Sequence, residues 1–140
     1  MNLERLFEED KIKKVTEKKL DLSLTDRDLN SAKHSFESKD YDWALSIAYN
    51  SVLQAARALM FSLGYRPAGK NQHRTVFEFL SQTDIEESLI DYFDGIRKTR
   101  HIAVYDIAET VSEEMAKEAI KQAEIFVHKI RTDVHKIRTK

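Results

Sequence analysis

The sequence YFDGIRKTRHIAVYD, residues 92–106, decides how this chain folds. Together with the residues just before it, this stretch repeats apolar or small side chains alternately four and three positions apart, as one face of a helix does. A second set of apolar and basic side chains lies on the opposite face, because each residue advances by about 100° around a helix. The sequence therefore predicts a helix that is buried on both sides. The first face carries Ile85, Leu89, Tyr92, Ile96, Thr99 and Ala103, and the second carries Ile90, Phe93, Arg97, Arg100, His101 and Val104.

A helix that is buried on two sides is either central in its own domain or lies between its core and a partner. Two arginines and a histidine on the second face suit a partner cleft better than a core. We therefore expect this face to carry the functional residues, and we expect a homodimer that forms through Ile90, Phe93 and Val104. Gly95 lies inside the helix, where a glycine costs about 0.5–1 kcal/mol relative to alanine, so its position suggests the close approach of another segment.

The composition bounds the class of protein. A chain of 140 residues with 41% hydrophobic residues can bury a core as one domain. It contains no cysteine, which excludes disulfides and thiolate metal sites. The N-terminal residues do not resemble a signal peptide, and no apolar stretch approaches membrane-spanning length. We expect a cytoplasmic protein without membrane contact, in which a net charge of −1 leaves any nucleic-acid contact to a local basic patch.

The chain has three glycines and one proline, too few for the turns of several β-hairpins, so an all-α fold is predicted. The hydrophobic centre is residues 41–63, with Asp40 as the capping residue before it and a stripe of small side chains where a neighbouring helix should cross closely. Thr25 and Asp28 resemble a capping box at the start of the preceding helix. Residues 1–24 are expected to form an extension that packs on, or leads into, a bundle of residues 25–140. The small stripe is Ala44, Ala48, Ser51, Ala55, Ala58 and Ser62.

The last helix is predicted to begin at its capping residue Ser112 and to continue to Thr139, over roughly 42 Å at 1.5 Å per residue. Its apolar residues keep a four-three alternation, and the sequence HKIRT occurs at residues 128–132 and again at residues 135–139. His128 and His135 are expected on the exposed flank. We expect the second repeat to overhang the bundle and to pair with another chain or with the N-terminal segment.

The predicted architecture is an antiparallel four-helix bundle with an additional short helix. Four segments carry a resemblance to a known family: DYDWALSIAYNSVLQAARALMFSLGYRP, GKNQHRTVFEFL, YFDGIRKTRHIAVYD and VSEEMAKEAIKQAEIFV. Together they resemble the HEPN domain family, in particular its small prokaryotic members, over residues 25–129. The resemblance implies a dimer with an arginine-centred motif at the interface cleft. It also implies either a metal-independent ribonuclease, often the toxin beside a small nucleotidyltransferase antitoxin, or a member that binds nucleotides or RNA or acts as a partner.

The family motif consists of arginine, a polar residue, three further residues and histidine. Carried over to this chain, Arg100 takes the arginine position, His101 the polar position and Tyr105 the position of the histidine. RNA cleavage without metal needs a base near neutrality, which a histidine with a pKa of about 6.5 provides and a tyrosine with a pKa of about 10 does not. His101 shares a helical face with Arg97, which leaves a shorter arginine-to-histidine pair as the alternative catalytic arrangement.

The sequence therefore favours a homodimeric module that binds RNA or a nucleotide at the cleft without catalysis. Two alternatives stay open, a metal-independent ribonuclease toxin and a purely structural partner of a nucleotidyltransferase. No cofactor is expected, and no metal, since Glu124 and His128 have no third ligand at helical spacing. The expected ligand-binding residues are Arg97, Arg100, His101, Tyr105, Asp106 and His73. His73, with Lys70 and Arg74, either extends a basic rim around the site or belongs to a solvated loop.

Overall fold

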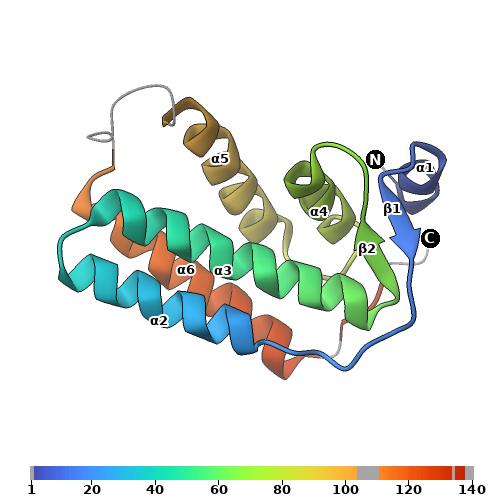
Figure 1. Ribbon diagram of the computed structural model, residues 1–140, viewed down its shortest axis with the longest axis horizontal. Coiled ribbons are helices and arrows are strands. Elements are labelled where there is room, and N and C mark those ends of the chain that lie inside the picture. Colours follow the sequence, from blue (N-terminus) through green and yellow to red (C-terminus); the bar gives the residue numbers. More distant parts are fainter. Residues whose placement is uncertain (1, 104–110, 134, 138–140) are drawn as a thin grey trace.

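The computed structural model describes residues 2–103, 111–133 and 135–137, and for residues 99–103 it describes the backbone alone. These residues form six helices and one two-stranded sheet (Figure 1). The prediction of an all-α fold class is confirmed, with α2, α3, α5 and α6 as the long helices. The elements are α1 (Leu3–Glu8), β1 (Ile12–Lys14), α2 (Ser23–Glu37), α3 (Tyr41–Ser62), β2 (Tyr65–Pro67), α4 (Gln72–Leu80), α5 (Glu87–Ala103) and α6 (Glu113–Thr132).

Helix α3 is the centre of the molecule, as its hydrophobic sequence predicted. Helices α2 and α6 lie along it on one side, and α4 and α5 contact it from another (Figure 1). Helices α2 and α3 run in opposite directions and are joined by a short turn, whereas α6 runs in the direction of α3. The small side chains Ala44, Ala48, Ser51 and Ala55 are fully buried, as are Ala116, Ala119 and Ala123 of α6. Side chains of this size allow two helix axes to approach closely.

The helix starts were predicted with mixed success. Ser112 caps α6 as expected, because its Oγ accepts a hydrogen bond from the backbone N–H of Met115 at 3.2 Å. Asp40 is the capping residue of α3, but its side chain makes no capping bond there. The predicted start of α2 at Thr25 is wrong: the helix begins at Ser23, and Thr25 is buried.

The small sheet was not predicted. Strands β1 and β2 pair antiparallel, with Ile12 opposite Pro67 and Lys14 opposite Tyr65. Tyr65 then lies between the rings of Phe7 and Phe79, with centroid distances of 5.6 and 5.5 Å. The sheet thus attaches the N-terminal segment to the end of α3 and to α4.

The last helix is shorter than predicted. Helix α6 ends at Thr132, and Asp133 adopts an extended conformation, so a helix to Thr139 is wrong. An acidic residue is unfavourable at the negative end of the helix dipole. His135, expected on an exposed flank, is almost fully buried: its Nδ1 lies 2.8 Å from Asp84 Oδ1, and its Nε2 lies 2.8 Å from the carbonyl oxygen of Lys129. Ile137 forms a β-bridge with Thr83, so the tail folds back onto its own chain at the α4–α5 connection.

Within the described ranges, none of the helices combines the length and the apolar character that crossing a membrane would require.

Candidate functional site

Helix α5 is buried on both sides, as its two apolar stripes predicted. The first stripe places Ile85 and Leu89 in the core, and the second places Ile90 and Phe93 there. The Phe93 ring contacts Phe126 of α6 at a centroid distance of 6.0 Å. The expectation that Ile90 and Phe93 form a dimer face is therefore wrong, because this chain's own helices already cover them. The third residue of that face, Val104, lies outside the described residues.

Arg97 is held in place by an acidic neighbour one turn earlier on α5. Its Nε donates a hydrogen bond to Asp94 Oδ1 at 2.7 Å, and Lys98 Nζ lies 3.6 Å from Asp94 Oδ2. About a quarter of the Arg97 side chain is exposed. A guanidinium has five N–H donors, so its two terminal amino groups can still bind an oxyanion in a bidentate manner.

Arg97 and Lys98 line a groove of about 660 Å³ between α4 and α5. Arg74 of α4 lines the same groove and is held by Glu78, with Nε 3.1 Å from Oε1. The other Glu78 oxygen, which is shielded from solvent, lies 3.6 Å from Lys11 Nζ. Four cationic and three acidic side chains line the groove, which leaves one net positive charge. Its lining is Arg5, Arg74, Phe77, Glu78, Ser81, Ile90, Asp91, Asp94, Arg97 and Lys98.

The structure thus brings together Arg97 and Arg74 but not His73. The His73 ring faces α3, where its Nδ1 lies 3.4 Å from the hydroxyl oxygen of the buried Tyr49. Lys70 does not line the groove either. Asp94 was missed by the sequence analysis, although an acid three positions before an arginine on a helix predicts such a pair.

Helix α5 carries the first two positions of the motif, Arg100 and His101. Helix α5 continues through Ala103, so positions 97 and 101 are one helical turn apart and position 100 is their neighbour. The side chains of Arg100 and His101 lie outside the description, and Tyr105 and Asp106 lie outside the described residues.

Two further observations bear on chemistry. Burial, and then the carboxylate of Glu118, raises the pKa of the Tyr92 hydroxyl, so Tyr92 stays protonated near neutral pH and cannot serve there as a base. Among the described residues, no group of three histidine, aspartate or glutamate side chains is placed to hold a metal ion. Glu124 instead forms an ion pair with Lys33, at 3.2 Å.

Two curated archaeal proteins are similar to the chain. The UPF0332 protein of Archaeoglobus fulgidus is 29% identical over 130 residues, which cover 89% of this chain and 100% of that protein. A protein of Methanocaldococcus jannaschii named "Putative toxin" is 23% identical over 112 residues, which cover 79% of this chain and 76% of that protein. No solved structure matches.

The family model of the HEPN domain matches residues 22–133, well over half of the chain. This range begins at the end of the N-terminal connector and ends where α6 ends. It includes the groove residues of α4 and α5, and also the motif positions 100, 101 and 105. The chain belongs to the HEPN domain family.

Proposed function

We propose that this HEPN module is a homodimer that binds RNA or a nucleotide beside the arginines of α5 and does not catalyse cleavage. The observation that carries the proposal is the Asp94–Arg97 pair at the α4–α5 groove. It fixes a guanidinium where Lys98 and Arg74 add further positive charge. Arg100, on the same helix, has the position of the family's motif arginine.

Phosphate is the ligand group that this arrangement favours. Arginine binds phosphate oxygens through paired, charge-assisted hydrogen bonds. The acidic side chains of the groove reduce its net charge, so a phosphate must be bound by oriented donors rather than by a strong field. This chemistry suits a ligand with a defined phosphate position better than non-specific coating of a polyanion.

The absence of catalysis is proposed from the motif. Tyr105 takes the position of the motif histidine, and a tyrosine is almost wholly protonated near pH 7. It cannot accept the proton of a ribose 2′-hydroxyl at neutrality as an imidazole can. Arg97, Arg100 and His101 are then left as binding groups.

Binding is tested by titrating labelled single-stranded RNA into Arg97→Gln at several salt concentrations. We expect the affinity to fall roughly tenfold or more, because a hydrogen bond to a charged group contributes about 1.5–3 kcal/mol. The salt dependence should also lose about 0.7 of a log unit per log unit of salt, which corresponds to one phosphate contact. The matched control is Arg27→Gln, which removes the same charge from an exposed site on α2. Equal effects of the two variants would contradict the proposal.

A ribonuclease toxin is the second candidate, favoured by the name of the Methanocaldococcus relative. It is tested by incubating single-stranded RNA with the wild-type chain in the presence of a chelator. We expect no cleavage by the wild type and measurable cleavage by Tyr105→His, which restores an imidazole at the motif position. Robust wild-type cleavage that His101→Ala abolishes would replace the binding proposal with the toxin.

We further propose a small nucleotidyltransferase as the protein partner, as the family resemblance implies. Co-purification of the two proteins from a strain that expresses both tests this pairing. A stable complex that forms equally well with Arg97→Gln and Arg100→Gln, together with no RNA or nucleotide binding, would favour the third candidate, a purely structural partner.

A further inference from the structure

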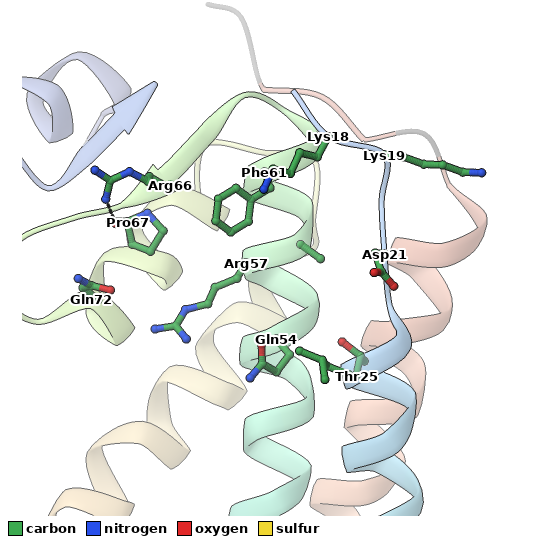
Figure 2. Close-up of a pocket in the computed structure, with 12 residues that line it drawn as sticks. Lys18, Lys19, Asp21, Thr25, Gln54, Arg57, Phe61, Arg66, Pro67 and Gln72 are labelled. Atoms are coloured by element: carbon green, nitrogen blue, oxygen red, sulfur yellow. Dashed lines mark hydrogen bonds between the residues drawn. The ribbon is translucent and has the colours of Figure 1, made fainter. Parts of the chain in front are cut away.

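A second pocket, of about 530 Å³, lies away from the α4–α5 groove (Figure 2). The C-terminal half of α3, the connector that leads into α2, the first turn of α2, strand β2 and the start of α4 form its walls. None of its lining residues belongs to α5. The pocket therefore shares no residue with the site proposed above, and its volume falls within the range of about 300–1,000 Å³ that is usual for small-molecule sites.

The lining is strongly cationic. Lys18, Lys19, Arg57 and Arg66 contribute positive charge, and Asp21 is the one carboxylate among the described lining residues. Figure 2 shows the guanidinium groups of Arg57 and Arg66 on the same side of Phe61, whereas Asp21 lies on the other side and Lys19 extends away. The Asp21 carboxylate accepts a hydrogen bond from the backbone N–H of Ser23 at 3.0 Å, which lowers the pKa of Asp21.

The two arginines differ from the others in the chain. Among the arginines whose side chains the structure describes, Arg57 and Arg66 are the ones that form no ion pair with a carboxylate. Arg66 donates from Nη1 to the carbonyl oxygen of Pro67 at 3.4 Å, and Arg57 lies half-buried on α3. A half-buried charge without a counter-ion is costly, so this position favours an anionic ligand. The paired arginines are Arg5, Arg27, Arg74, Arg97 and Arg131.

The remaining walls suit a flat, partly apolar group. The ring of Phe61 lines the pocket, with Lys18 Nζ 5.3 Å from its centroid. Leu24, which is 49% exposed, supplies apolar surface that the chain itself does not cover. Gln54 supplies an amide that can both donate and accept a hydrogen bond, as the edge of a nucleobase requires. The Gln72 amide nitrogen already donates to the carbonyl oxygen of Gly69 at 3.2 Å.

We propose that this pocket binds a nucleoside monophosphate, with the phosphate on Arg57 and Arg66 and the base against Phe61 and Leu24. Two guanidinium groups match the charge and the oxygen atoms of one phosphate dianion. The aromatic ring offers a stacking surface that accepts any base. We expect the Gln54 amide, which also lines the pocket, to contact the edge of the base or the ribose.

The test is calorimetric titration of the full chain with adenosine and uridine 5′-monophosphates, with the two nucleosides, and with inorganic phosphate. We expect at least tenfold tighter binding of the nucleotides than of either the nucleosides or phosphate. Arg57→Gln and Arg66→Gln should each weaken nucleotide binding at least tenfold. Phe61→Leu should weaken the binding of the nucleotides but not that of phosphate, and the control Arg27→Gln should change neither.

Three results would overturn the proposal. The first is no nucleotide binding by the wild-type chain at millimolar concentration. The second is equal affinity for phosphate and nucleotides, since the pocket would then be an anion site only. The third is loss of mononucleotide binding in Arg97→Gln with binding retained in Arg57→Gln and Arg66→Gln, which would place the ligand in the α4–α5 groove. Arg66 lies on a short strand outside the core, so Arg66→Gln carries the test if Arg57→Gln does not fold.

Discussion

Asp94 has two opposing effects on the affinity of the α4–α5 groove for an anion. Its carboxylate orients Arg97 and also contacts Lys98, but its own charge opposes a phosphate. In Asp94→Asn the amide oxygen can still accept the hydrogen bond from Arg97 Nε, while the negative charge is lost. We expect the affinity for single-stranded RNA to rise by up to about fivefold, since a partly exposed charge contributes roughly 0.2–1 kcal/mol. Fluorescence anisotropy at low salt measures the change.

The comparison variant is Asp28→Asn, which removes the same charge from α2 beside Arg27. Long-range electrostatics alone would raise RNA affinity equally in both variants, and that result would remove the argument for a local site. Weaker binding by Asp94→Asn would show that the amide fails to position Arg97, and thermal unfolding of the variant shows whether α5 itself is intact.

For single residues, the sequence predicts the helix face on which a side chain lies better than the side chains that it contacts. The place of Arg97 on the second face of α5 follows from helical periodicity, which is a local property. Its juxtaposition with Arg74 depends on how α4 packs against α5, and the contact of His73 with Tyr49 depends on how α4 packs against α3. Neither packing is encoded by spacing within one helix, which is why His73 was assigned to the wrong surface.

The C-terminal tail shows how tertiary contacts compete with helical periodicity. The HKIRT repeat has helical periodicity, yet α6 ends with its first copy. Residues 135–137 of the second copy are not helical, and His135 contacts Asp84 and the carbonyl oxygen of Lys129. We expect His135→Ala to lower the free energy of unfolding by roughly 1–3 kcal/mol, since two hydrogen bonds of about 0.5–1.5 kcal/mol each are lost. Chemical denaturation monitored by circular dichroism measures this loss.

The repeat supplies its own control. His128 occupies the same place in the first HKIRT copy and is exposed on α6, so His128→Ala should change stability by less than about 0.5 kcal/mol. If the two variants were equally stable, the hydrogen bonds of His135 to Asp84 and to Lys129 would contribute nothing to the stability of the fold.

Elements with long local repeats were predictable, and elements made by distant pairing were not. Helices α3 and α6 follow from apolar periodicity and, for α6, from the Ser112 cap. Strands β1 and β2 form because Ile12 pairs with Pro67, which is far from it in the sequence, and each strand is too short to show alternation in the sequence. The early end of α6 likewise coincides with a contact from another part of the chain.

For the whole molecule, Ile90 and Phe93 are buried within the chain, so a dimer contact on α5 must involve other residues of this helix. Gly95 is exposed on this helix, and a Cβ atom added there would meet no atom of the described chain within 4 Å. Packing within the described chain therefore gives no reason for a mid-helix glycine, which costs about 0.5–1 kcal/mol relative to alanine. The close approach of a partner helix would give one. We therefore place the proposed dimer contact at Gly95.

A dimer contact at Gly95 predicts that larger residues there stabilise the isolated chain but weaken the dimer. Gly95→Ala and Gly95→Leu should raise the stability of the isolated chain by roughly 0.5–1 kcal/mol, because both residues favour a helix and the space is open. In Gly95→Leu the added side chain should also separate the dimer, which light scattering at micromolar concentration would detect as a halved mass. Ser88→Leu, at an exposed position two turns earlier on α5, should leave the mass unchanged. A wild-type monomer, or a dimer that survives Gly95→Leu, would contradict a contact at this position. The unfolding of all variants is compared at a protein concentration where the wild type is monomeric, because dimer formation adds to the apparent stability.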